Sequence, residues 1–93
     1  MTIGLLTIDL LVPGARSLKD KRRVVKSLKD QVRNRYNCSV AETDHHDLWQ
    51  RARVSIVVVS NESAHANTQL NEIFRFVESR LGANVVDCQI EML

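Results

Sequence analysis

Residues 53–81, RVSIVVVSNESAHANTQLNEIFRFVESRL, join the strongest β-branched run of the chain to its clearest amphipathic helix. β-branched residues favour extended backbone, so residues 53–60 predict a strand. Residues 60–63, SNES, supply capping side chains, and apolar residues then recur at helical spacing until Gly82. A helix that packs one face on a sheet should therefore follow the strand. Its apolar stripe consists of Ala66, Leu70, Ile73, Phe74, Val77 and Leu81.

The N-terminal part of the chain shows the same order of strand and helix. Residues 2–12, TIGLLTIDLLV, are apolar on nearly both faces, as is typical of a central strand, and Pro13 ends the run. Ser17 and Asp20 have the spacing of a capping box, which predicts a helix over residues 18–36. The sheet-facing stripe of this helix is Leu18, Val24, Val25, Leu28, Val32 and Tyr36.

Two further strands complete the pattern. Residues 37–43, NCSVAET, resemble a strand, and residues 84–93 alternate between apolar and polar side chains. We therefore predict one α+β domain over residues 1–93, with βαββαβ order. Its four-stranded antiparallel sheet should have strand order 4-1-3-2, with both helices on one face. On the last strand Val86, Cys88, Ile90 and Met92 should face the helices. The open face should be polar and partly acidic, with Thr7, Asp9, Asp87, Gln89 and Glu91.

Composition excludes several classes of protein. With 44% hydrophobic and 26% charged residues the chain is neither disordered nor a disulfide scaffold. The first apolar run is too short for a membrane span and lacks a basic start, so membrane insertion and export are not expected. Cys38 and Cys88 should lie on opposite edge strands as buried reduced thiols, which favours the cytoplasm. A 93-residue domain buries a modest core, so we expect a homo-oligomer, a dimer in the simplest case.

Charge is concentrated in the first helix. Residues 16–35 hold nine basic and two acidic residues, whereas the whole chain has a net charge of only +2. Basic residues at three- and four-residue spacing form a ridge that could follow RNA phosphates, although a solvated helix face explains the same pattern. The expected phosphate contacts are Lys19, Arg22, Arg23, Lys26, Lys29 and Arg33. Because no aromatic residue lies in a predicted strand, contact should be through phosphates and shape, without DNA specificity.

The connection at residues 44–50 contains the other candidate site. Asp44, His45, His46 and Asp47 could ligate zinc together with Cys38 or His65, but adjacent histidines rarely aim at one ion. We therefore expect no metal and no cofactor, and the aspartates should instead cap turns. Trp49 either closes the core or, with Asp47 and His46, contacts a partner or a second copy. No nucleophile elbow or glycine-rich phosphate loop is present, so we predict no enzyme activity.

Four short motifs give the chain a family resemblance. SLKDKR at 17–22, VAE at 40–42, DLWQ at 47–50 and VSN at 59–61 together resemble the YlxP-like family, a bacterial domain of unknown function. The resemblance implies a ferredoxin-like fold, a bacterial cytoplasmic setting and no assigned activity. It also implies genes placed beside those for translation initiation factor two and ribosome-binding factor A.

Two functional hypotheses follow. The first is a non-enzymatic accessory protein of translation or ribosome assembly that contacts ribosomal RNA or ribosomal particles through the first helix. The second is a homo-oligomeric scaffold that uses the open sheet face or the Trp49 region and binds no RNA.

Overall fold

The computed structural model describes residues 1–80 and 82–93 and has the predicted βαββαβ order. In chain order the elements are β1 (Thr2–Leu11), α1 (Leu18–Arg35), β2 (Ser39–Asp44), β3 (Arg51–Ser60), α2 (Ser63–Glu78) and β4 (Asn84–Met92). Within these described residues, no helix is long and apolar enough to cross a membrane.

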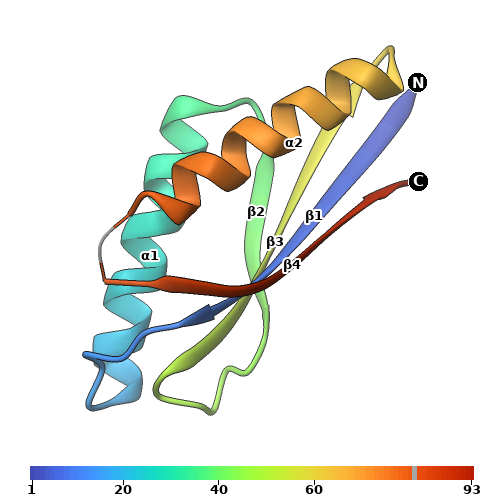
Figure 1. Cartoon of the computed structure of the whole chain (residues 1–93). Helices are drawn as coiled ribbons and strands as arrows, with labels where there is room; N and C mark the ends of the chain where they lie inside the picture. Colours follow the sequence, from blue (N-terminus) through green and yellow to red (C-terminus); the bar gives the residue numbers. More distant parts are fainter. Residues whose placement is uncertain (81) are drawn as a thin grey trace.

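The four strands form one antiparallel sheet in the order β2-β3-β1-β4, which is the predicted 4-1-3-2 order read from the other edge. Both helices cover the same face of this twisted sheet (Figure 1). The two termini lie together at one end of the molecule, and the β2–β3 hairpin lies at the other end, beside the start of α1. The predicted two-layer sandwich is confirmed.

The core lies between the helices and the sheet. Leu6, Ile8 and Leu10 of β1 are fully buried, because alternate residues of a strand point to the same face. α2 approaches β1 closely at Gly4, where a Cβ atom would come within 2.9 Å of Leu70 Cδ1. A glycine in a central strand is therefore explained by helix packing. The helices contribute Val25, Leu28, Val32, Ala66, Leu70, Ile73 and Val77.

The helix ends agree with the sequence in part. Ser17 Oγ accepts a hydrogen bond from the Asp20 amide at 3.1 Å, and Asp20 in turn accepts one from the Arg16 amide. The predicted Ser17 cap of α1 is thus formed, but Asp20 reaches back to the Arg16 amide instead of the Ser17 amide that a capping box requires. α2 begins at Ser63, but its N-cap residue Glu62 makes no side-chain capping hydrogen bond, so the predicted side-chain cap from residues 60–63 is not formed. The helix ends at Glu78 rather than near Gly82. Leu81, the last residue of the predicted stripe, lies outside the described residues.

β4 departs from the predicted alternation. Cys88 pairs with Ile8, but a bulge shifts the register so that Val85 instead of Val86 pairs with buried Leu10. Val85 therefore packs on the core, and Val86 is 47% exposed, so the prediction that Val86 faces the helices was wrong. Cys88 is also exposed, not buried, because β4 is an edge strand with a neighbour on one side only.

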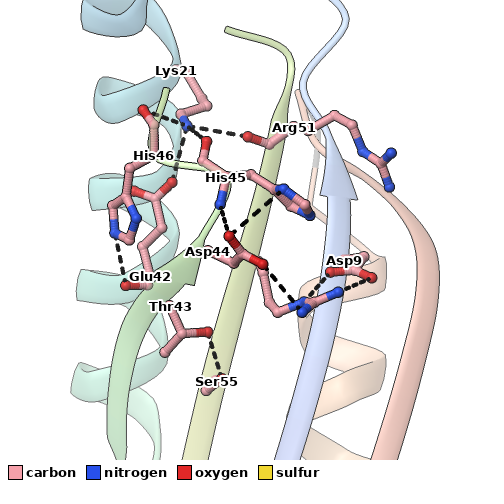
Figure 2. Close-up of polar contacts among 10 residues, drawn as sticks. Asp9, Lys21, Glu42, Thr43, Asp44, His45, His46, Arg51 and Ser55 are labelled. Carbon is pink, nitrogen blue, oxygen red and sulfur yellow. Dashed lines mark hydrogen bonds and ion pairs between the residues drawn. The ribbon is translucent and has the colours of Figure 1, made fainter. Parts of the chain in front are cut away.

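A second bulge, in β2, separates two acidic residues. Glu42 pairs with Val54, whereas Asp44 pairs with Arg53, so one extra residue, Thr43, interrupts the register. Residues two apart in a regular strand share a face. Because of the bulge, Glu42 instead points under α1 and Asp44 points to the open face (Figure 2).

Lys21 is fully buried on the inner face of α1, although it belongs to the basic run of the sequence. Its ammonium donates to the carbonyl oxygens of His45 at 2.7 Å and Arg51 at 3.1 Å, and more weakly to that of His46 at 3.4 Å. Glu42 Oε2 lies 3.0 Å from the same nitrogen. Figure 2 shows these four oxygens around the ammonium. Lys21 thus neutralises a half-buried carboxylate and fastens both ends of the β2–β3 hairpin to α1.

We predict that Lys21→Met lowers the free energy of unfolding by about 3–5 kcal/mol, because it leaves Glu42 and three carbonyl groups without their cation. Lys26→Met is the matched control, since Lys26 lies in the same helix and is 75% exposed. The control should change stability by less than about 0.5 kcal/mol. Urea unfolding of the two variants measures the difference, and equal midpoints would contradict this role for Lys21.

Candidate nucleic-acid interface

A groove of about 500 Å³ runs between α1 and the edge strand β2. The helix wall of the groove carries four of the six predicted phosphate contacts: Arg22, Lys26, Lys29 and Arg33. The opposite wall is formed by Ala41 and Glu42, with His46 at the hairpin end. Because Glu42 is already neutralised by Lys21, the groove presents an excess of positive charge.

Two of the groove residues are partly neutralised. Asp30 accepts a hydrogen bond from Lys26 at 2.7 Å and lies 3.6 Å from Arg33. The Lys26 ammonium holds the pKa of Asp30 below its usual range. Arg33 also donates to the Val40 carbonyl at 2.8 Å, which ties α1 to the edge strand. These contacts fix the shape of the groove but reduce its charge.

The other four predicted contacts fall in three places. Arg22 and Lys29 face the groove and make no ion pair with a carboxylate in the part of the chain that the structure describes. Lys19 is exposed one turn before the groove. Arg23 lines a different cavity, on the α2 side of the helix, together with Arg80. The six residues therefore do not form one surface, and Arg23 is separated from the rest.

The hairpin cluster uses its polar groups internally. Asp44 Oδ1 accepts a hydrogen bond from the His45 amide at 2.7 Å, which supports the left-handed backbone of His45 (φ 63°) and agrees with the expected turn-capping role. His46 Nε2 lies 3.2 Å from the Glu42 carbonyl oxygen. Among residues 1–80 and 82–93, no three histidine, cysteine or acidic side chains are close enough to hold a metal.

Trp49 lies on the surface of the same hairpin with 56% of its area exposed. It therefore does not close the core, and of the two predicted roles only the contact with a partner or a second copy remains. Asp47, which was predicted to share that contact, is also exposed.

Comparison with known proteins identifies the family of this chain. Residues 3–90 match the family described as a protein of unknown function, DUF503. The chain belongs to the DUF503 family. It is 32% identical over 77 residues to the uncharacterized protein YlxP of Bacillus subtilis (strain 168). The matched region covers 83% of this chain and 84% of YlxP. The predicted family resemblance is confirmed.

The structural comparison finds a de novo designed protein with a ferredoxin fold, solved by solution NMR. The two share 16% sequence identity with a TM-score of 0.48 over the whole of this chain and 83% of the designed one.

The open face of this DUF503 domain is polar at its centre. Asp9 is nearly buried there, and Arg53 donates to both of its carboxylate oxygens, at 2.7 and 3.2 Å. Arg53 also reaches Asp44 at 3.4 Å, and Thr43 and Ser55 share a hydrogen bond at 2.8 Å beside it (Figure 2). These groups satisfy one another, so they form a structural network on this part of the face.

The two cysteine thiols are less buried than predicted. Cys38 is half-buried just before β2, and burial raises the pKa of its thiol. Cys88 is exposed on the opposite edge strand.

Sequence reasoning missed the two charged residues that organise this end of the domain. Lys21 occupies the vacant position between Leu18 and Val25 in the apolar stripe of α1, and that gap was the available signal. From the sequence, Arg53 was predicted only to begin the strand at residues 53–60. Nothing in the local sequence indicates that it would pair with Asp9, which is 44 residues away.

We predict that Asp9→Asn lowers the melting temperature by several degrees at pH 7. Arg53 lowers the pKa of Asp9, chiefly through its hydrogen bond, so the carboxylate stabilises the fold above the unfolded-state pKa, about 3.9. This contribution is lost as the pH falls below about 4 and Asp9 becomes protonated. Thermal melts from pH 7 to pH 2.5 should show the two proteins converging. Asp87→Asn, the same change on an exposed residue of the same face, should leave the melting temperature nearly unchanged at pH 7.

Proposed function

We propose that this protein is a non-enzymatic accessory of translation or ribosome assembly that binds RNA by its phosphates along α1. The observation that carries the proposal is the groove between α1 and β2. Arg22 and Lys29 face it without a carboxylate partner in the described residues, and Lys26 and Arg33 lie beside them. A basic groove that follows a backbone is the common feature of proteins that bind single-stranded nucleic acid.

The location of the groove suits a flexible strand better than a duplex. It is bounded by one helix and one strand edge, and Arg33 and Lys26 are held in place by Val40 and Asp30. Side chains that are already ordered lose less entropy when they bind a phosphate. Arginine in addition offers a planar pair of donors that matches phosphate oxygens.

The open sheet face does not support base recognition. Sheets that recognise RNA bases place aromatic rings on their strands. Here the aromatic residues lie on helices or in connections: Tyr36 follows α1, Trp49 is in the hairpin, and Phe74 and Phe76 are in α2. The sheet itself thus contributes no stacking rings, and the basic groove is the better candidate.

An oligomeric scaffold is the second candidate, and a separate surface favours it. Val59 is 63% exposed at the end of the sheet near the termini, where it pairs with Ile3, and Leu93 is 68% exposed beside them. A second copy could cover this apolar end. Analytical ultracentrifugation at micromolar concentration tests the candidate, and a monomer would argue against it.

We predict that the double variant Arg22→Gln/Lys29→Gln weakens RNA binding and its salt dependence together. Loss of two phosphate contacts should make the slope of log affinity against log salt shallower by about 1.4 for a single strand. Fluorescence anisotropy of a labelled twelve-residue oligouridylate measures this slope, and co-sedimentation with ribosomal particles tests the cellular partner.

The control removes the same charge from α2 and the segment that follows it, in Arg75→Gln/Arg80→Gln. It should weaken binding less and leave the slope close to that of the unmodified protein. Equal effects of the two double variants would indicate nonspecific attraction by net charge. Absence of binding to either oligouridylate or ribosomal particles would refute the proposed function.

A further inference from the structure

We infer that Trp49 is a stacking platform for an unpaired base of the RNA strand that lies in the α1–β2 groove. This inference rests on the proposed function and names the ligand more closely: a single-stranded segment with at least one accessible base. It gives a role to the one aromatic residue that neither the core nor the sheet uses.

The first observation is that Trp49 is exposed together with its neighbour. Trp49 exposes 56% of its surface and Leu48 exposes 44%. A single exposed apolar residue is ordinary, but two adjacent large ones on a short hairpin indicate a contact surface. An indole ring offers a flat face on which any base can stack.

The second observation is that the hairpin holds this position rigidly. Before Trp49, the Lys21 ammonium binds the carbonyl groups of His45 and His46, and after it the carbonyl of Arg51. Gln50, the next residue, accepts from the Val12 amide at 2.8 Å and donates to the Ala15 carbonyl at 3.1 Å. The exposed ring is therefore presented by a fixed backbone, so little conformational entropy is lost when a ligand covers it.

The third observation is that the groove leads to this hairpin. His46 lines the groove beside Arg22, and Trp49 follows three residues later in the same connection. A strand whose phosphates contact Lys29 and Arg22 would continue toward the hairpin end. Asp47 is exposed in the same connection, whereas Arg51 at the start of β3 extends over β1, on the side away from His46 (Figure 2). The basic groove favours a polyanion over an apolar protein partner as the molecule that reaches Trp49.

The test uses the fact that Trp49 is the only tryptophan in the chain, so its fluorescence reports on this site alone. Unlabelled twelve-residue oligouridylate should quench the emission on binding, because a stacked base lies against the indole. Inorganic polyphosphate of matched length carries the charge without bases. It should compete for the groove but leave the emission largely unchanged.

Affinity measurements on variants complete the test. Trp49→Ala should weaken oligouridylate binding by about tenfold or more without changing the salt slope, because stacking involves no phosphate contact. Trp49→Phe should retain most of the affinity. Val86→Ala is the control, because Val86 is an exposed apolar residue on β4, the edge strand opposite β2, and this variant should bind as the unmodified protein does.

The outcomes separate this inference from the proposed function. If oligouridylate binds with the expected salt slope but neither quenches Trp49 nor is weakened by Trp49→Ala, the stacking role is wrong and the groove proposal stands. If neither polyanion binds, both are wrong. A shift of the emission that grows with protein concentration in the absence of RNA would assign Trp49 to an interface between copies and overturn its role in RNA binding.

Discussion

The buried ammonium of Lys21 is the interaction on which the arrangement of this domain depends. One nitrogen is shared by three backbone carbonyls of the hairpin and the carboxylate of Glu42. An ammonium removed from water must find such partners, because an uncompensated buried charge is strongly unfavourable. Lys21 therefore ties the end of β2 and the start of β3 to α1.

The same interaction explains why the candidate interface is well defined on so small a domain. The connection at residues 45–50, with exposed Leu48 and Trp49, would be mobile if nothing held its backbone. Here its first residues and its exit are fixed to α1, and Gln50 fixes it to the turn after β1. Buried polar groups of this kind are retained for structural specificity in some proteins, and this hairpin fits that role.

Positive charge has two separate roles in α1. Lys21 faces inward and is structural, whereas Arg22 and Lys29 face the groove and are available to a ligand. These roles follow from the helical repeat of 3.6 residues, which turns adjacent residues about 100° apart. Net charge alone therefore overstates the basic surface of α1, and Asp30 reduces it further by pairing with Lys26 and Arg33.

The sequence by itself determined the element order, the strand order, the family and most of the core. Periodicity identified Leu28, Val32, Leu70 and Val77, because a helix that covers a sheet must repeat its apolar side chains every three to four residues. What only the tertiary structure decided were the faces of residues at bulges and the partners of charges. The extra residue in β2 sends Glu42 to Lys21 and Asp44 to Arg53, and the bulge in β4 turns Val86 outward. A bulge reverses the alternation that sequence reasoning relies on, and the pairing of Asp9 with Arg53 joins residues that are distant in the chain, so neither leaves a local signal.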